Sequence, residues 1–176
     1  KVLAKEYDIK PEISYYPNFI VVDDYAYIGI LLQNFGIEDS PKFNLTLKAN
    51  GAVVDSIIVE GLSPSNYYYK DLNWMPASEG TYEIEVVVDI NDSNKANNIA
   101  KDKVKVFKTK EVNISFADTN GNFVERQIEL GNVGTLVNGV ASLTIPDIPL
   151  EFIIGKQGSD EIAASFYSNS TINGKI

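Results

Sequence analysis

The feature that most constrains the fold of this chain is an alternation of apolar and polar residues with a period of two. In the segment 81–90, for example, Tyr82, Ile84 and Val86 alternate with Glu83 and Glu85. Side chains two positions apart point to the same face of a β-strand, so each such segment can bury one face only. Because these segments recur roughly every ten residues with turn signals between them, the sequence predicts an all-β sandwich.

Seven segments of this kind fall in the first part of the chain. They span residues 7–16, 24–34, 42–49, 52–59, 66–75, 81–90 and 99–107. Turn residues separate them: Asn50-Gly51 marks a two-residue hairpin, and Pro76 and Gly80 bracket a loop after Trp74. The side chains that we expect to share one core are those of Ile28, Ile30, Leu32, Trp74, Tyr82, Ile84, Val86 and Val88.

The strand pattern restarts near residues 108–110, which indicates a second unit. Five strands are expected there, at 112–116, 123–130, 140–145, 150–154 and 162–167. The predicted organisation is an N-terminal extension at 1–6, an immunoglobulin-like seven-stranded β-sandwich at 7–108, and a second, smaller β-sandwich unit at 109–176. So small a second unit buries a lower fraction of its surface, so we expect it either to dock on the first unit or to receive a strand from elsewhere.

Charge and composition narrow the possible functions. The net charge of −9 disfavours nucleic acid and anionic membranes as partners, because the field of the protein repels phosphate groups. No apolar run reaches the roughly 20 residues of a membrane helix, so no membrane insertion is expected. The chain has no His and no Cys, which removes the commonest general base and the thiolate nucleophile. We therefore expect no enzyme activity and no cofactor.

Several short motifs resemble the CARDB family, the cell adhesion related domain found in bacteria, over about residues 6–107. The motifs are Asn34-Phe35-Gly36, Asn50-Gly51, Gly61-Leu62-Ser63-Pro64, Trp74-Met75-Pro76 with Gly80-Thr81-Tyr82, Val88-Asp89 and Asn97-Asn98. The family has a Glu shortly before its paired Asn, and the segment 92–96 stands in that place here. The resemblance implies a sandwich that acts outside the cell as a spacer or adhesion module, without catalysis. The second unit resembles surface-protein β-sandwich modules loosely.

One loop has the oxygen-rich spacing of a calcium site. Asp89, Asn91 and Ser93 stand at alternate positions, but the loop lacks both the Gly at the sixth place and the distal bidentate Glu of a calcium-binding loop. A turn rich in Asp and Asn explains the same residues. We favour the turn and keep these three residues as metal candidates.

Four Asn-x-Ser/Thr sequons make Asn44, Asn91, Asn113 and Asn169 candidates for N-glycosylation. The alternation predicts that Asn44 and Asn113 face solvent, with Phe43, Leu45, Ile114 and Phe116 in the core. An aromatic surplus is a second surface signal, since tyrosine rings can stack on sugars or on a partner protein. It comprises Tyr15, Tyr16, Tyr25, Tyr27 and the run Tyr67-Tyr68-Tyr69.

The sequence thus favours a non-catalytic extracellular protein with a structural or adhesive role at a prokaryotic cell surface. Ile, Asn and Lys usage, the lack of Cys and the sequons favour an archaeal source. Partners would be other copies of the chain or other surface proteins, and glycans. Val2, Leu3 and Ala4 could pair with a neighbour's open sheet edge and build a filament or surface layer by β-strand addition. A frayed terminus is the simpler interpretation of that segment. The alternative function is a spacer or carbohydrate-binding accessory module of a larger secreted hydrolase.

Overall fold

A computed structural model describes residues 7–115, 120, 122, 126–130, 133–137, 140–148, 151–155 and 162–167. The chain divides into two compact units, Lys1–Lys108 and Thr109–Ile176. One residue, Lys108, stands between the last strand of the first unit and the first strand of the second. The described residues of each unit form mainly β-strands, as the alternation predicts.

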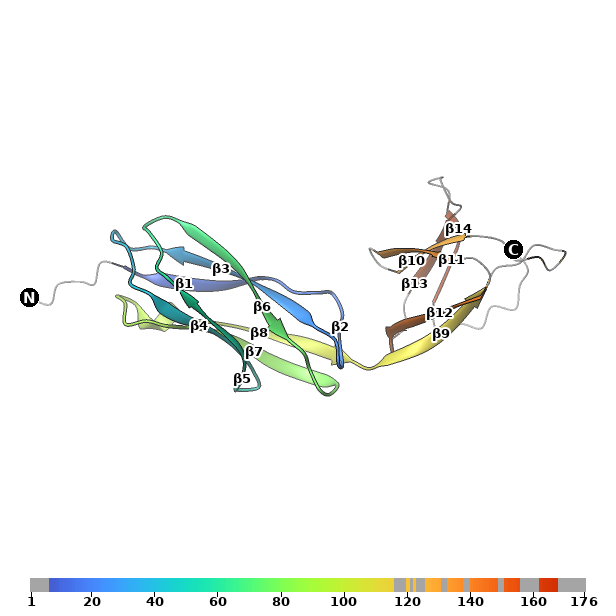
Figure 1. Ribbon diagram of the computed structural model, residues 1–176, viewed down its shortest axis with the longest axis horizontal. Helices are drawn as coiled ribbons and strands as arrows, with labels where there is room; N and C mark the ends of the chain where they lie inside the picture. Colours follow the sequence, from blue (N-terminus) through green and yellow to red (C-terminus); the bar gives the residue numbers. More distant parts are fainter. Residues whose placement is uncertain are drawn as a thin grey trace, which may run out of the picture. The chain divides into compact units, whose positions relative to one another are not determined.

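The first unit is a sandwich of two sheets (Figure 1). The smaller sheet has the order β1-β3-β6, with β1 at Ile9–Tyr15, β3 at Ala26–Asn34 and β6 at Tyr67–Trp74. The larger sheet has the order β2-β8-β7-β4-β5, with β2 at Ile20–Val21, β8 at Ile99–Phe107, β7 at Gly80–Asp89, β4 at Phe43–Ala49 and β5 at Ala52–Val59. All seven predicted strands of this unit are present.

Strand β2 is the one strand of this unit that the sequence did not predict, and the short 3-10 helix η1, Lys95–Asn97, was not predicted either. Strand β2 has two residues and pairs in parallel with β8, Ile20 with Val106 and Val21 with Phe107. The amide of Val22 extends the pairing with a hydrogen bond to the carbonyl of Phe107 (3.0 Å). A two-residue strand has no periodicity to detect, and only the tertiary fold brings its partner alongside.

The core lies between the two sheets and confirms the predicted alternation. In β4, Phe43 and Leu45 are buried while Asn44 is exposed. Trp74 is buried and meets the half-buried Tyr82 edge to face, with ring centroids 4.9 Å apart. The other members of the predicted core are all buried in the same cluster, namely Ile28, Ile30, Leu32, Ile84, Val86 and Val88.

Glycines make two of the turns possible. The β4–β5 hairpin turns at Asn50 and Gly51 with φ of 47° and 81°, the left-handed pair expected of an Asn-Gly turn. Gly61 has φ of 128°, and a Cβ there would lie 2.6 Å from the backbone oxygen of Ser40. The loop before β6 therefore packs against the loop before β4 through a position without a side chain.

The two ends of the first unit lie at opposite poles of the sandwich. We call the end where β1 and β8 begin the entry pole; it carries Tyr7, Asp8 and the loops at 35–42, 60–66 and 90–98. The other end, where β8 finishes at Phe107, is the exit pole. At about 3.3 Å per residue, the nine residues of β8 span roughly 30 Å between the poles.

The described residues of the second unit form two sheets. One has the order β11-β10-β13-β14, with strands at Val133–Val137, Arg126–Leu130, Glu151–Gly155 and Ile162–Tyr167. The other pairs β12, Val140–Pro146, with β9, Thr109–Ser115. Strand β11 was not predicted, because Gly131 and Gly134 break its apolar pattern. Phe116 lies outside the described residues, as do the side chains of Asn113 and Ile114.

Candidate functional site

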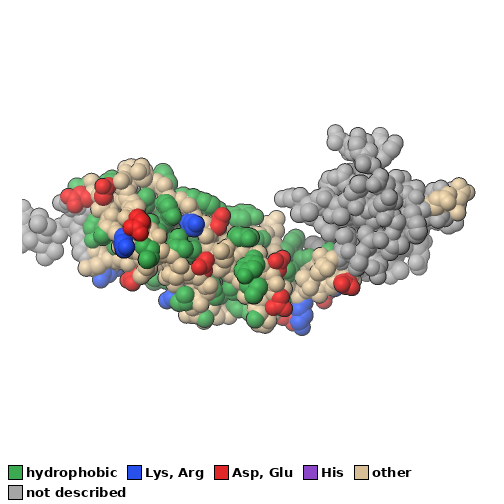
Figure 2. Space-filling view, viewed as in Figure 1, with side chains coloured by type: hydrophobic (Ala, Val, Ile, Leu, Met, Phe, Trp, Pro, Cys, Tyr) green, Lys and Arg blue, Asp and Glu red, His purple; other side chains and the backbone are tan. Residues whose placement is uncertain are grey.

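The described part of the chain contains no group of three or more Asp, Glu, His or Cys side chains placed to hold a metal ion. Among the same residues, no helix is long and apolar enough to cross a membrane. Figure 2 shows apolar side chains interspersed with polar and charged ones over the face of the first unit that it draws. The polar and aromatic groupings of the first unit lie in the loops of the entry pole and on the outer faces of the two sheets.

Four polar residues meet at the entry pole, and we call Asp8, Asp92, Asn97 and Asn98 the polar cluster. The Asp92 carboxylate is 5% exposed and accepts hydrogen bonds from the backbone amides of Ile9 (2.9 Å) and Asn94 (3.2 Å). It also accepts one from the side-chain amide of Asn98 (3.3 Å). The cluster therefore ties the first strand to the β7–β8 loop.

The two asparagines of the cluster are only half satisfied. Asn97 donates from Nδ2 to the carboxylate of Asp8 (2.9 Å), and Asn98 donates from Nδ2 to the carbonyl of Ile90 (3.2 Å) as well as to Asp92. Their Oδ1 atoms are both buried and have no hydrogen-bond partner. Leaving a buried acceptor unpaired costs about 1–3 kcal/mol, so these two oxygens are exceptions that need a reason.

Another buried asparagine, Asn34, lies at the same pole and forms four hydrogen bonds with the backbone. Asn34 is 1% exposed, and its Oδ1 accepts hydrogen bonds from the amides of Asp8 (3.1 Å) and Gly36 (2.9 Å). Its Nδ2 donates to the carbonyls of Glu38 and Leu62, both at 2.8 Å. In contrast to Asn97 and Asn98, this side chain is fully satisfied, and its role is to hold three segments of the entry pole together.

The predicted metal candidates lie at the end of β7 and on the loop that follows it, and they face outward. Asp89, Asn91 and Ser93 are exposed, and the Ser93 hydroxyl donates to the carbonyl of Tyr7 (3.1 Å). Between them, Asp92 turns inward and forms the Asp-type turn that the sequence suggested, with its carboxylate bound to the amide two residues later. The inward acid was missed because alternation alone does not show which oxygen of such a loop is buried.

Of the four sequons, two can be placed. Asn44 is exposed on the outer face of β4, as predicted, and Asn91 is exposed in the β7–β8 loop. Asn113 belongs to β9, where it pairs with Ser142, but its side chain lies outside the described residues. Asn169 is also outside the described part of the chain.

The predicted aromatic surplus gathers on the outer face of the β1-β3-β6 sheet. Exposed rings from all three strands form what we call the tyrosine face, made of Tyr15, Tyr27, Tyr67 and Tyr69. Gly29 lies at its centre: a Cβ there would be 2.3 Å from the hydroxyl of Tyr69 and 3.3 Å from the Cβ of Tyr15. The missing side chain leaves room for the Tyr69 ring to lie across β3.

The Tyr69 hydroxyl donates to the carboxylate of Asp71 (2.9 Å), and this bond is the main reason that the pKa of Tyr69 is raised above 10.0. At the seam between the sheets, the hydroxyl of Tyr16 donates to Asp102 (3.1 Å), which likewise raises the pKa of Tyr16. Both phenols therefore stay protonated hydrogen-bond donors at neutral pH. Tyr16 packs against the core, whereas Tyr69 presents its ring outward.

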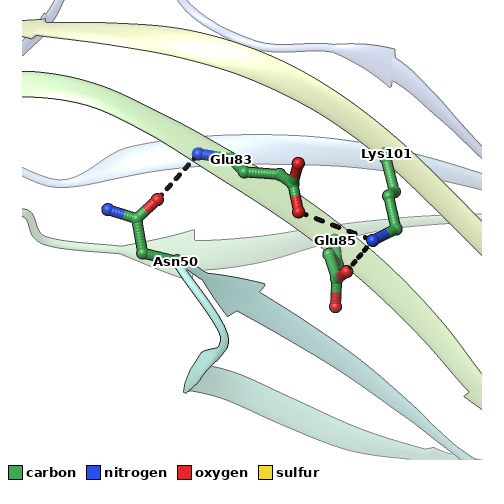
Figure 3. Close-up of polar contacts among 4 residues, drawn as sticks. All are labelled: Asn50, Glu83, Glu85 and Lys101. Atoms are coloured by element: carbon green, nitrogen blue, oxygen red, sulfur yellow. Dashed lines mark hydrogen bonds and ion pairs between the residues drawn. The ribbon is translucent and has the colours of Figure 1, made fainter.

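The outer face of the larger sheet has a different character. There Lys101 of β8 forms an ion pair with Glu85, its cross-strand neighbour, and a longer one with Glu83 (3.5 Å), while Asn50 accepts a hydrogen bond from the amide of Glu83 (Figure 3). The bond to Lys101 lowers the pKa of Glu85, and the same bond raises that of Lys101. These polar groups bind one another, so we assign them to stabilising the sheet and not to binding a ligand.

Comparison with known proteins agrees with this fold. The CARDB family model matches residues 7–102, which is 96 of the 176 residues. The CARDB domain of the PF1109 protein from Pyrococcus furiosus, solved in complex with di-metal ions, is 27% identical with a TM-score of 0.53, covering 60% of this chain and 97% of that domain.

A domain at residues 272–376 of a predicted cell surface protein from Methanosarcina acetivorans is 24% identical with a TM-score of 0.47, covering 59% of this chain and 93% of that one. A search of the curated proteins gives no match. CARDB is a non-catalytic, cell-adhesion-related family of surface-associated β-sandwich domains. With more than half of its length matched by the family model, this chain belongs to the CARDB family.

Proposed function

We propose that this protein is a non-catalytic structural or adhesive subunit that works outside the cell, at a prokaryotic and specifically archaeal surface. The observation that carries the proposal is the position of the two ends of the first unit at opposite poles. Strands β1 and β8 both run from the entry pole to the exit pole, and a single residue continues the chain into β9. A domain with this path adds its full length to a chain of modules.

The same path makes the domain suited to bear tension. A pull on the two ends acts along the strands, whereas the hydrogen bonds of the β1–β3 and β2–β8 pairs run across them. Such a pull loads many bonds together instead of one after another. Entry-pole contacts such as the Asp92 bond to Ile9 add side-chain anchors to the β1 backbone.

Force measurements test the spacer function. The chain has no Cys, so pairs of cysteine handles can be introduced without competition. Handles at Tyr7 and Lys108 load the strands in shear, and matched handles at Ala77 and Lys108, both at the exit pole, peel β7 from β8. We expect a clearly higher rupture force for the first pair. Equal forces would contradict a role in carrying tension.

More specifically, copies of the protein would assemble by β-strand addition, with Val2, Leu3 and Ala4 as the added strand. An open edge is available in β6, the outer strand of the smaller sheet. The amide of Asn73 points away from β3, since it donates to Asp55 of β5 (2.7 Å). Amides two residues apart in an antiparallel strand point the same way, so those of Tyr67, Tyr69 and Asp71 face the open side.

A pair of substitutions tests this assembly. Leu3→Pro removes an amide that the added strand needs, whereas Leu3→Val keeps it together with the β-propensity. Sedimentation of the full chain should show concentration-dependent assembly that Leu3→Pro and deletion of Lys1–Lys5 abolish and Leu3→Val retains. A full chain that stays monomeric at high concentration, or a deletion that assembles equally well, would overturn strand addition.

The alternative, a spacer or carbohydrate-binding accessory module of a larger secreted hydrolase, is favoured by the tyrosine face. Exposed rings on neighbouring strands offer the flat apolar surface on which sugar rings stack. Affinity electrophoresis in gels that contain soluble polysaccharides measures such binding directly. Retardation that Tyr27→Ala and Tyr69→Ala abolish, while Tyr25→Ala outside the strands does not, would favour the accessory module over the structural subunit.

We also propose that Asn44 and Asn91 carry glycans in the native protein, because both sequons have an exposed acceptor. The intact mass of material from the native source is the measurement. Extra mass in hexose-sized steps that Asn44→Gln reduces supports the proposal. A mass equal to that of the bare polypeptide removes it.

A further inference from the structure

Two buried amide oxygens with no partner single out the polar cluster. Asn98 is 5% exposed, and both its Oδ1 and that of Asn97 are shielded from solvent without a hydrogen bond. The Nδ2 atom of each amide is bound to a carboxylate of the cluster, Asp8 for Asn97 and Asp92 for Asn98. Each orphan oxygen therefore belongs to an amide whose nitrogen is bound to an acidic side chain.

The charge of the cluster is also uncompensated. None of the ion pairs in the described part of the chain includes Asp8 or Asp92, and Asp92 is buried. Burying a carboxylate without a cation nearby is unfavourable, even when amides donate to it. Orphan carbonyl oxygens and negative charge at one place both call for the same kind of ligand, a cation.

From these contacts we infer that the polar cluster binds a calcium ion through the Oδ1 atoms of Asn97 and Asn98, with the carboxylates of Asp8 and Asp92 supplying charge. Ca²⁺ takes carboxylate and amide oxygens in flexible geometry, whereas Mg²⁺ demands a rigid octahedron and keeps its waters. The ion would join the first strand to the β7–β8 loop at the pole where the chain enters the sandwich. This site differs from the outward-facing set of Asp89, Asn91 and Ser93.

The fluorescence of Trp74 gives a selective readout. It is the single tryptophan of the chain and is buried in the core of the first unit, so its thermal transition reports the unfolding of that unit within the full chain. In chelated protein, added CaCl₂ should raise this transition by roughly 5–10 °C with saturation near millimolar concentrations, the range of extracellular calcium modules. NaCl of equal ionic strength should leave it unchanged, and MgCl₂ should raise it less.

Two variants locate the ion. Asn97→Ala removes one orphan oxygen and should weaken the calcium dependence at least 10-fold, whereas Asp89→Asn, on the outward-facing set, should leave it intact. If Asn97→Ala does not fold, NMR of the unchanged protein replaces it: Ca²⁺ should shift the side-chain amide signals of Asn97 and Asn98. The site is overturned if millimolar Ca²⁺, in at least 10-fold molar excess over the protein, does not raise the temperature of the Trp74 transition. So does a rise that Asp89→Asn abolishes, or side-chain amide signals that do not move.

Discussion

The carboxylate of Asp92 accepts a hydrogen bond from the backbone amide of Ile9 at 2.9 Å, across a separation of 83 residues. Both residues are buried, and the bond joins the beginning of β1 to the loop that follows β7. The same carboxylate also accepts a hydrogen bond from the amide of Asn94 and so holds this loop. The beginning of the first strand is thus held by a side chain from a loop late in the sequence of the unit.

Asp92→Ala should lower the free energy of unfolding of the first unit by roughly 2–4 kcal/mol, because it strands the buried amide of Ile9 without an acceptor. Asp89→Ala, an exposed acid at the end of β7 beside that loop, is the matched control and should change the free energy of unfolding by less than about 0.5 kcal/mol. Urea unfolding followed by Trp74 fluorescence, in chelator so that metal does not contribute, is the measurement. Equal effects of the two substitutions would show that the bond to Ile9 does not stabilise the fold.

Ile84→Ala should destabilise the same unit by roughly 2–5 kcal/mol, since Ile84 is fully buried in the core and the change leaves a cavity. Ile37→Ala removes the same atoms from a side chain that is 80% exposed and should stay within about 0.5 kcal/mol. The same urea titration compares them. A loss below about 1 kcal/mol for Ile84→Ala would place β7 outside the core.

Two glycine substitutions separate backbone strain from collision. Gly51→Ala places a methyl group in open space at a φ of 81°, so only conformational strain of about 1 kcal/mol is expected. Gly61→Ala adds a collision with the backbone oxygen of Ser40 to a φ of 128° and should cost roughly 2–4 kcal/mol. Chemical denaturation of both variants tests the order. A cost of Gly61→Ala no greater than that of Gly51→Ala would mean that the two loops move apart easily.

Acid should weaken the contact between Glu85 and Lys101. The pKa of Glu85 is lowered in the folded protein, so its contribution to stability is present above the ordinary value of 4.5 and is lost as pH falls through the depressed folded value. Glu85→Gln should therefore flatten the dependence of unfolding free energy on pH below 4.5. Glu60→Gln, which removes an exposed acid 3.9 Å from Lys42, is the control for loss of a carboxylate, and its effect should be smaller because exposed ion pairs contribute little to stability. An unaltered pH profile in Glu85→Gln would contradict the pairing.

The sequence by itself determined seven of the eight strands of the first unit, because one face of each is buried and a period of two is visible without any partner. The alternation through Phe43, Asn44 and Leu45 fixed which side faces the core, and Asn50-Gly51 fixed the hairpin that follows. These features are local: they follow from side-chain direction and from the φ angles that individual residues accept. The division after Lys108 is local too, since the strand pattern restarts there.

Tertiary structure alone decided the features that depend on distant partners. Strand β2 exists because Val106 and Phe107 of β8 come alongside it, and Gly29 has meaning only because the Tyr69 ring crosses β3. In the same way, no local pattern shows that Asp92 turns inward while its neighbours stay exposed. A polar group is buried where hydrogen-bond partners are available to it. Here the donor is the amide of Ile9, which is 83 residues away in the sequence.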